Sequence, residues 1–170
     1  MTRPHRPVAA VFALASLALV GCGDDGAAEP GTIEVEMSDF SFDDLPSSVP
    51  AGTEIAVSNT SSSELHELVA FRLADDDDRS VDDVLADAAA LMASEPALVV
   101  LAAPGSDEQI VAVGDGTLTE PGRYLIACFI PTGADPDEYL AAAATSDGPP
   151  DVDGGAPHLA HGMFAELVVT

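Results

Sequence analysis

Four side chains in the sequence carry the sulfur and imidazole groups that bind soft metal ions. Cys128 lies in the apolar stretch RYLIACFIP, and the later segment PHLAHGMF contains His158 and Met163. His66 lies upstream in the polar segment NTSSSELHE. Soft sulfur favours Cu(I) and imidazole also accepts Cu(II), so this set suits copper in both oxidation states. We therefore predict one mononuclear copper ion with these four residues as its ligands.

The first 21 residues predict a secretory signal peptide of the lipoprotein type. Arg3 and Arg6 form a positive N-terminal region, and the apolar run at 8–20 that follows is too short for a permanent membrane helix. The order Leu19-Val20-Gly21-Cys22 resembles the bacterial lipoprotein signal, in which the cysteine becomes the lipidated first residue of the mature chain. We expect an extracytoplasmic protein that lipid on Cys22 anchors to the cell membrane.

The remainder divides into a tether and one domain. Residues 22–31 are polar, acidic and rich in glycine and proline, which predicts a flexible lipidated tether. Residues 32–170 are enough for one compact domain and not comfortably for two.

The charge of the chain restricts its partners. Five Lys and Arg stand against 30 Asp and Glu, and two of the five lie in the signal peptide, so the mature chain has a formal charge of −27. This excludes nucleic acid and anionic lipid as electrostatic partners. It permits attraction to a basic redox partner protein, although acidity more often serves solubility.

The cysteine count makes Cys128 the residue to explain. Cys22 and Cys128 are the two cysteines of the chain, and a lipidated Cys22 leaves Cys128 without a disulfide partner. A free thiol outside the cell is open to oxidation unless it is buried or bound to metal. A lone cysteine in an apolar strand is usually a small buried hydrophobe. His66, His158 and Met163 also occur in the chain, and the order, spacing and strand context of the four residues together favour metal ligation instead.

Hydrophobic periodicity predicts a mainly β domain. Alternating or apolar runs separated by turn residues predict strands at 32–43, 54–59, 64–73, 97–103, 108–113 and 163–170. The stretch 116–130 predicts a turn at Pro121-Gly122 and then a strand into Cys128. Ser80 and Asp135 occupy N-cap positions of two predicted helices, at 80–93 and 134–144. Many short strands of this kind indicate an antiparallel sandwich or barrel, here with two inserted helices.

Three parts of the chain resemble the cupredoxins, the plastocyanin- and azurin-like type 1 copper proteins. They are the AGT turn at 51–53 with the strand to Asn59, the His66-Glu67 pair, and the Tyr124–Cys128 strand followed by PHxxxGM at 157–163. The resemblance implies a Greek-key β-sandwich and one-electron transfer through one type 1 copper ion. His158 and Met163 have the four intervening residues of plastocyanin-like members, so His158 is preferred to His161 as ligand.

The resemblance also implies supporting residues around the ligands. The side chain of Asn59 is expected to bond between the two ligand loops. Pro157 and Gly162 are expected to restrict and shape the backbone of the second loop. One departure from the family pattern is the 29 residues between Cys128 and His158, where simple cupredoxins have only a few. This insertion must bulge outward and return to the same end of the domain.

Two other functions fit the same residues. The ligands could serve copper trafficking or storage without a redox partner, or the domain could be a metal-free interaction module. Zinc is disfavoured because thioether is a poor zinc ligand. Cys128 follows an apolar strand, without the elbow or helix N-terminus that activates a catalytic thiol, so we do not expect an enzyme.

Overall fold

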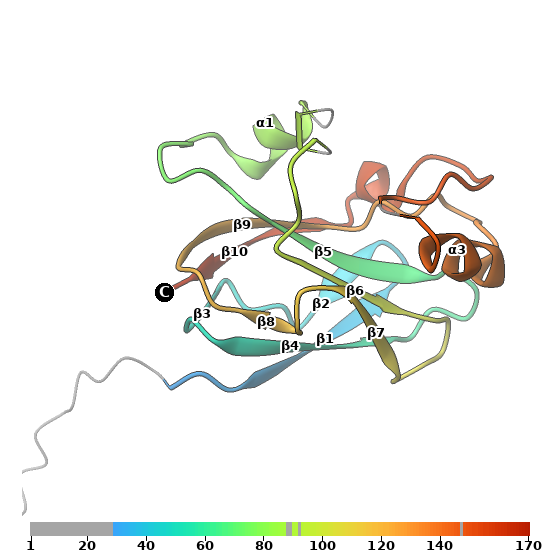
Figure 1. Ribbon diagram of the computed structural model, residues 1–170, viewed down its shortest axis with the longest axis horizontal. Coiled ribbons are helices and arrows are strands. Elements are labelled where there is room, and N and C mark those ends of the chain that lie inside the picture. Colours follow the sequence, from blue (N-terminus) through green and yellow to red (C-terminus); the bar gives the residue numbers. More distant parts are fainter. Residues whose placement is uncertain (1–28, 88–89, 92, 147) are drawn as a thin grey trace, which may run out of the picture.

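Two β-sheets packed face to face form the body of the protein in the computed structural model (Figure 1). The structure describes residues 29–87, 90–91, 93–146 and 148–170, so the predicted signal peptide and Cys22 lie outside the described residues. The expected mainly β sandwich is confirmed. Within the described ranges, no helix is both long enough and apolar enough to cross a membrane.

The first sheet contains four strands among the described residues, in the order β2-β1-β4-β8. These strands are β1 (Thr32–Ser38), β2 (Ser41–Asp43), β4 (Thr53–Asn59) and β8 (Thr117–Leu118). Alternate residues of β1 and β4 point into the sandwich, where Val35, Met37, Ile55 and Val57 are buried. This is the two-residue period expected of a sheet with one face in water.

The second sheet contains six strands in the described chain, in the order β3-β10-β9-β5-β6-β7. They are β3 (Ser48–Val49), β5 (His66–Arg72), β6 (Leu98–Ala102), β7 (Gln109–Val113), β9 (Gly122–Ala127) and β10 (Phe164–Val169). The central strand β5 is covered on both faces. Leu68 and Ala70 belong to the core between the sheets, and Val69 and Phe71 to a second cluster on the outer face.

Two strand pairs correct the expectation of a wholly antiparallel sheet. β1 pairs with β4 in parallel, and β3 pairs with β10 in parallel. After β2 the chain crosses to the other sheet as β3 and then returns as β4, so β1 and β4 run the same way. The hairpin at 39–40 also divides the single strand predicted at 32–43 into β1 and β2.

The two helix starts agree with their predicted caps. The side chain of Ser80 accepts from Asp83 N before α1 (Val81–Leu85), and that of Asp135 accepts from Glu138 N before α3 (Pro136–Ala143). α1 is shorter than the predicted helix, because a turn follows Leu85; residues 88, 89 and 92 of that prediction lie outside the described residues. α1 stands over the outer face of β5 and β9 (Figure 1).

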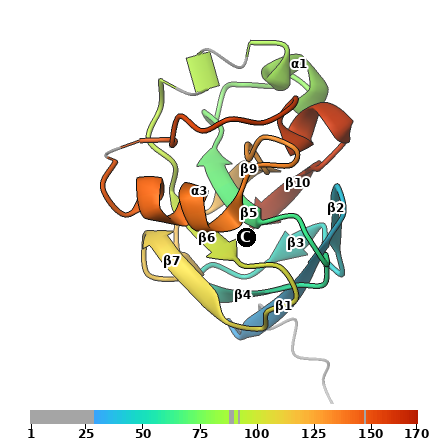
Figure 2. The same ribbon diagram turned by 90° about the vertical axis from the view of Figure 1, so that its right-hand side faces the viewer.

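The two ends of the sandwich differ in what they carry. The C-terminus and the point where the described chain begins lie at one end (Figure 1). α3 lies at the opposite end, across from the β1–β2 hairpin (Figure 2). β5 begins and β9 finishes at this second end, which we call the site end.

Candidate metal centre

Strand pairing brings the predicted ligands to the site end. β5 begins at His66 and β9 stops at Ala127, one residue before Cys128. The two strands are antiparallel, with Val69 opposite Ala127, so the start of one lies beside the finish of the other. His158 opens the short 3-10 helix η1 (His158–His161) that precedes β10. The three side chains are wholly buried, with 0% exposure each.

The ligand atoms of these residues face one another. Nδ1 of His66 lies 3.1 Å from Nδ1 of His158, and Sγ of Cys128 lies 3.3 Å from the same His158 atom. The three ligand atoms all lie within 4.8 Å of one another. Imidazole and thiolate bind a comparable ion, zinc, at about 2.0–2.3 Å, so atoms at 3.1 and 3.3 Å can reach one ion together.

Glu64 fixes which nitrogen of His158 is free to bind. His158 Nε2 lies 3.2 Å from Oε2 of Glu64, and a carboxylate only accepts, so Nε2 donates and Nδ1 keeps its lone pair. The same Oε2 accepts from Gly133 N at 2.9 Å, which holds the carboxylate in place. A carboxylate behind a ligating imidazole is the usual support of a metal-bound histidine. No motif marked Glu64, which stands at the start of the strand predicted at 64–73 and lies in the loop before β5.

His66 supplies a further observation that fits a metal ion. Its Nε2 is buried without a hydrogen-bond partner among the described residues, and Asp39 Oδ1 is 3.9 Å away. Its Nδ1 has one partner, the Nδ1 of His158, so without metal a proton must lie between the two imidazoles. The two Nδ1 lone pairs would hold an ion at this place, and Nε2–H of His66 would then face Asp39.

A thiolate and two imidazoles around one buried point are the equatorial set of a blue copper centre. The His66–Cys128–His158 group fits a type 1 copper site.

This chain resembles several solved auracyanin structures at low sequence identity. No known family model and no curated protein matches. Dithionite-reduced auracyanin from Roseiflexus castenholzii is 19% identical, with a TM-score of 0.47, over 85% of this chain and 99% of the other. Auracyanin A, a "blue" copper protein from Chloroflexus aurantiacus, is 18% identical, with a TM-score of 0.44, over 84% and 100%. Auracyanin B is 18% identical, with a TM-score of 0.36, over 85% and 93%. At these values the likeness carries no argument about this chain. The sandwich fold follows from the strand pairing, and the His66–Cys128–His158 group could hold a metal ion.

Met163 lies beside the other three residues through its backbone. Its carbonyl accepts from Cys128 N at 3.2 Å, and its N–H donates to His158 O at 3.2 Å. The residue is fully buried in the core between the sheets. Its role as the axial thioether ligand stays a prediction. His161, the alternative to His158, is exposed and lies outside the group.

The three supporting residues have different surroundings from one another. Nδ2 of Asn59 donates to Glu64 O and to Ala102 O, at 2.9 Å each, and its Oδ1 accepts from Ser61 N. Asn59 therefore joins the His66 loop to β6, and its bonds within the described chain do not include the expected one to the second ligand loop.

Pro157 and Gly162 flank η1. Pro157 is its N-cap and forms an isolated bridge with Pro131. Gly162 ends η1 with φ of 103°, a left-handed conformation that glycine adopts without strain. This turn directs the chain from His158 back to Met163.

The long insertion closes at its own base, which answers the departure from the family pattern. His158 N donates to Ile130 O at 3.0 Å, and Leu159 N donates to Cys128 O at 2.8 Å. One step further out, Thr132 N and Oγ1 both donate to Ala156 O. Gly154 packs so closely on Pro131 that a Cβ would clash. We call this pairing of 128–132 with 154–159 the neck. Because of the neck, the residues between its two sides, 133–153, lie outside the ligand loop. We call this part of the insertion the arm.

Burial controls the protonation of the ligands. It lowers the pKa of His66 to about 4, and the neighbouring His158 adds to this; burial also lowers the pKa of His158. Burial raises the pKa of the Cys128 thiol far above its ordinary value, and Glu67 adds to the effect. At neutral pH the metal-free site therefore has two neutral imidazoles and a thiol.

Glu67 ties the arm to both ligand strands. Its Oε1 accepts from Phe129 N at 3.1 Å, and its Oε2 accepts from the hydroxyl of Tyr139 in α3 at 3.3 Å. Burial raises the pKa of this carboxyl to about 7. Glu67, the residue after His66 in β5, thus bonds to Phe129, the residue after Cys128, and to Tyr139 of the arm.

Proposed function

We propose that this chain is a cupredoxin-like lipoprotein that transfers single electrons through one type 1 copper ion at the outer face of the cytoplasmic membrane. Cys128, His66 and His158 supply the equatorial ligands, and Met163 supplies the weak axial one. Lipid on Cys22 holds the domain at the membrane, and a redox protein is the partner. The proposal includes no catalytic reaction.

The observation that carries the proposal is the convergence of two Nδ1 atoms and one Sγ, all from fully buried residues. Bound copper would cycle between its +1 and +2 states there. The protein's part is to keep the ligands still. β5 and β9 hold His66 and Cys128 in a sheet, the neck positions His158, and Glu64 fixes its ring. A rigid and dry site suits electron transfer because little has to move when the charge changes.

A visible spectrum tests this function. The purified protein loaded with Cu(II) should be intensely blue or green from thiolate charge transfer. Cys128→Ser should abolish the colour, and Cys22→Ser, the matched control at the other cysteine, should retain it. Loss of colour in both variants would refute the copper site. A wild-type protein that stays colourless with Cu(II) would refute it as well.

Cell fractionation tests the anchor. The wild-type chain should sediment with membranes, and Cys22→Ser should not. Equal distribution of the two proteins would contradict the lipidated tether, without bearing on the copper site.

Electron exchange separates electron transfer from copper trafficking or storage by the same ligands. An electron carrier should be oxidised and reduced rapidly by small redox complexes and keep its copper. A storage protein should release Cu(I) to a competing chelator and exchange electrons slowly.

A further inference from the structure

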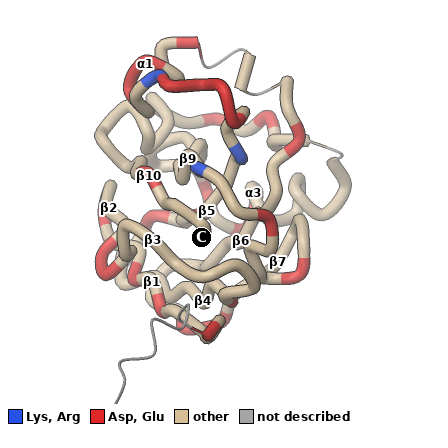
Figure 3. Tube along the Cα trace, turned by 90° about the vertical axis from the view of Figure 1, so that its left-hand side faces the viewer, with Lys and Arg blue, Asp and Glu red and all other residues tan. Residues whose placement is uncertain are grey.

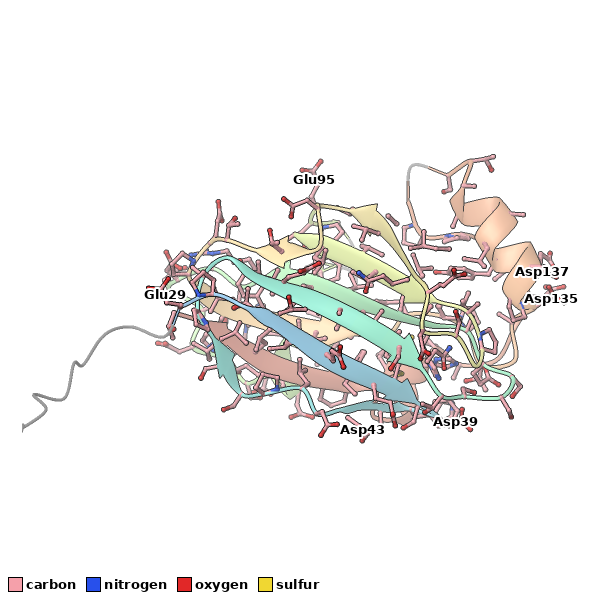
Figure 4. The ribbon with its side chains drawn as sticks, turned by 90° about the horizontal axis from the view of Figure 1, so that it is seen from below. Glu29, Asp39, Asp43, Glu95, Asp135 and Asp137 are labelled. Atoms are coloured by element: carbon pink, nitrogen blue, oxygen red, sulfur yellow. The ribbon has the colours of Figure 1, made fainter. Side chains whose placement is uncertain are left out.

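The turn between β1 and β2 covers both imidazoles of the site. Oδ1 of Asp39 is 3.9 Å from Nε2 of His66. The ring of Phe40 meets that of His158 edge-on, with centroids 5.1 Å apart. Each residue of this two-residue turn therefore lies over one ligand. Figure 4 shows Asp39 toward the site end of the molecule.

Phe40 holds this place in an unfavourable backbone conformation. Its φ is 66°, in the left-handed region, while Asp39 before it is not among the residues with positive φ. A turn with positive φ at its third residue normally has glycine or asparagine there. A non-glycine residue pays about 1–2 kcal/mol for that conformation, and such outliers point to a functional hypothesis when the surroundings hold them. Here the left-handed conformation of Phe40 places its aromatic ring against the imidazole of His158.

The ring of His161 packs on that of Phe40 and continues this layer to the surface. Its ring lies 4.7 Å from that of Phe40, tilted by 33°. His161 is exposed and Phe40 half-buried, whereas His66 and His158 have no exposed surface. On the side of the β1–β2 turn, Asp39, Phe40 and His161 therefore lie between a partner and the two imidazoles. We call these three residues the cover.

The charge around the cover is of one sign. The described chain has three arginines, all at the opposite end: Arg72 finishes β5, Arg123 lies in β9, and Arg79 lies next to them. Arg72 lies six positions after His66 in β5, about 20 Å along an extended chain. Each arginine is paired with an acid. Figure 3 shows the blue segments gathered by α1 and β9.

The acids at the site end have no such partners. The β1–β2 hairpin carries Glu36, Asp39, Asp43 and Asp44, all exposed. Asp43 bonds to two serine hydroxyls, which lower the pKa of its carboxyl and keep it ionised. Asp39 lies against His66 and leaves 62% of its side chain exposed. A cation approaching this end meets attraction only.

We propose that the cover is the docking surface for a positively charged one-electron partner, which exchanges its electron with the site through Phe40 and His161. In one turnover the site loses one electron and the oxidised partner gains it, with no atom or proton transferred. This inference rests on the proposed function and adds the entry point and the charge of the partner.

The first test compares two small oxidants of opposite charge on the reduced, copper-loaded full chain. They are the trication tris(phenanthroline)cobalt(III) and the trianion ferricyanide. At low ionic strength the ratio of their rate constants, cation over anion and each corrected for its own driving force, should exceed unity by about tenfold or more, and salt should reduce it. A variant that changes the reduction potential alters both rates alike, so the ratio between variants reports docking alone.

Charge reversal locates the docking surface. Asp39→Lys should lower the ratio by about fivefold or more, because it places a positive charge at the contact. Glu95→Lys, the matched control on a distant exposed residue, should leave it nearly unchanged (Figure 4). Equal effects of the two substitutions would overturn the assignment. If Asp39→Lys does not fold, the milder Asp39→Asn replaces it in the test and should lower the rate ratio by a smaller factor.

A second measurement needs no variant. The redox-inert cation hexaamminechromium(III) should broaden the NMR signals of Asp39, Phe40 and His161 in the Cu(I) protein more than those near Glu95. Broadening spread evenly over the acidic surface would overturn the proposal. A protein that does not bind copper fails the proposed function itself, and the colour test reveals that separately.

Discussion

At the scale of single residues, Glu64 supports the site although no motif in the sequence marks it. It binds His158 Nε2 and Gly133 N with one oxygen, so it fixes a ligand and fastens the start of the arm. A carboxylate at this place also adds negative charge beside the metal, which favours the higher oxidation state.

Glu64→Gln should therefore raise the reduction potential. The amide keeps the shape of the side chain but loses its charge, and we expect a rise of some tens of millivolts, since about 60 mV corresponds to 1.4 kcal/mol for one electron. The blue colour should persist. Voltammetry checks this, with Glu54→Gln on the exposed face of β4 as control. An unchanged or lower potential would contradict the role of the carboxylate.

Copper binding should release about one proton per ion near pH 7, because metal ligands must be deprotonated. The pKa of His66 lies at about 4 and that of His158 is lowered, so both imidazoles are already neutral, while the raised pKa of Cys128 keeps its thiol protonated. Calorimetry in buffers of different ionisation enthalpy counts the protons. Cys128→Ser should release none, and a wild-type release of two would show that an imidazole is protonated.

At the scale of elements, two short segments decide the geometry of the site. The neck returns the chain to Cys128 after the arm, and the β1–β2 turn covers the imidazoles. The neck explains how a separation of 29 residues coexists with a compact ligand group. Because its backbone bonds lie at the base, the length of the arm has little influence on the ligands.

The strain in the turn can be measured by comparing two variants of Phe40. Both Phe40→Gly and Phe40→Ala remove the ring, but glycine accepts a φ of 66° and alanine does not. The glycine variant should be more stable by about 1 kcal/mol, the reverse of the usual order. Urea denaturation of the metal-free proteins gives the difference. Alanine equal to or above glycine would show that the turn is unstrained.

Local signals made part of this structure predictable. Alternation placed β1 and β4, and the caps at Ser80 and Asp135 placed both helix starts. Residue types and spacing selected the His66, Cys128 and His158 that the fold brings together. Long-range pairing was not predictable: neither the parallel β1–β4 pair nor the neck has a local pattern. Glu64 and Phe40 were not predicted as part of the site. Each lies within a stretch predicted as a strand, where an acid or an aromatic residue is common and carries no functional signal.

At the scale of the whole molecule, charge and function are arranged along the long axis. The described chain begins near Glu29, at the end away from Asp39 (Figure 4). A tether attached there would leave the site end facing away from the membrane anchor. The arginines lie at the end away from the site, whereas the β1–β2 hairpin that contributes Asp39 and Phe40 to the cover carries four exposed acids.

The net charge of −25 should make stability depend on salt. Repulsion among the acids outweighs three arginine ion pairs within the described residues, so screening should favour the folded state. Raising sodium chloride from low to physiological concentration should raise the melting midpoint by a few degrees, since about 1 kcal/mol shifts it by about 2–8 °C. A fall in the midpoint would show that the ion pairs dominate.

X-ray absorption at the copper edge tests the central claim most directly. The copper-loaded protein should show one sulfur at short distance and two imidazole nitrogens, and Cys128→Ser should lose the short sulfur. A spectrum with only nitrogen and oxygen neighbours, unchanged by Cys128→Ser, would contradict a copper site built on His66, Cys128 and His158.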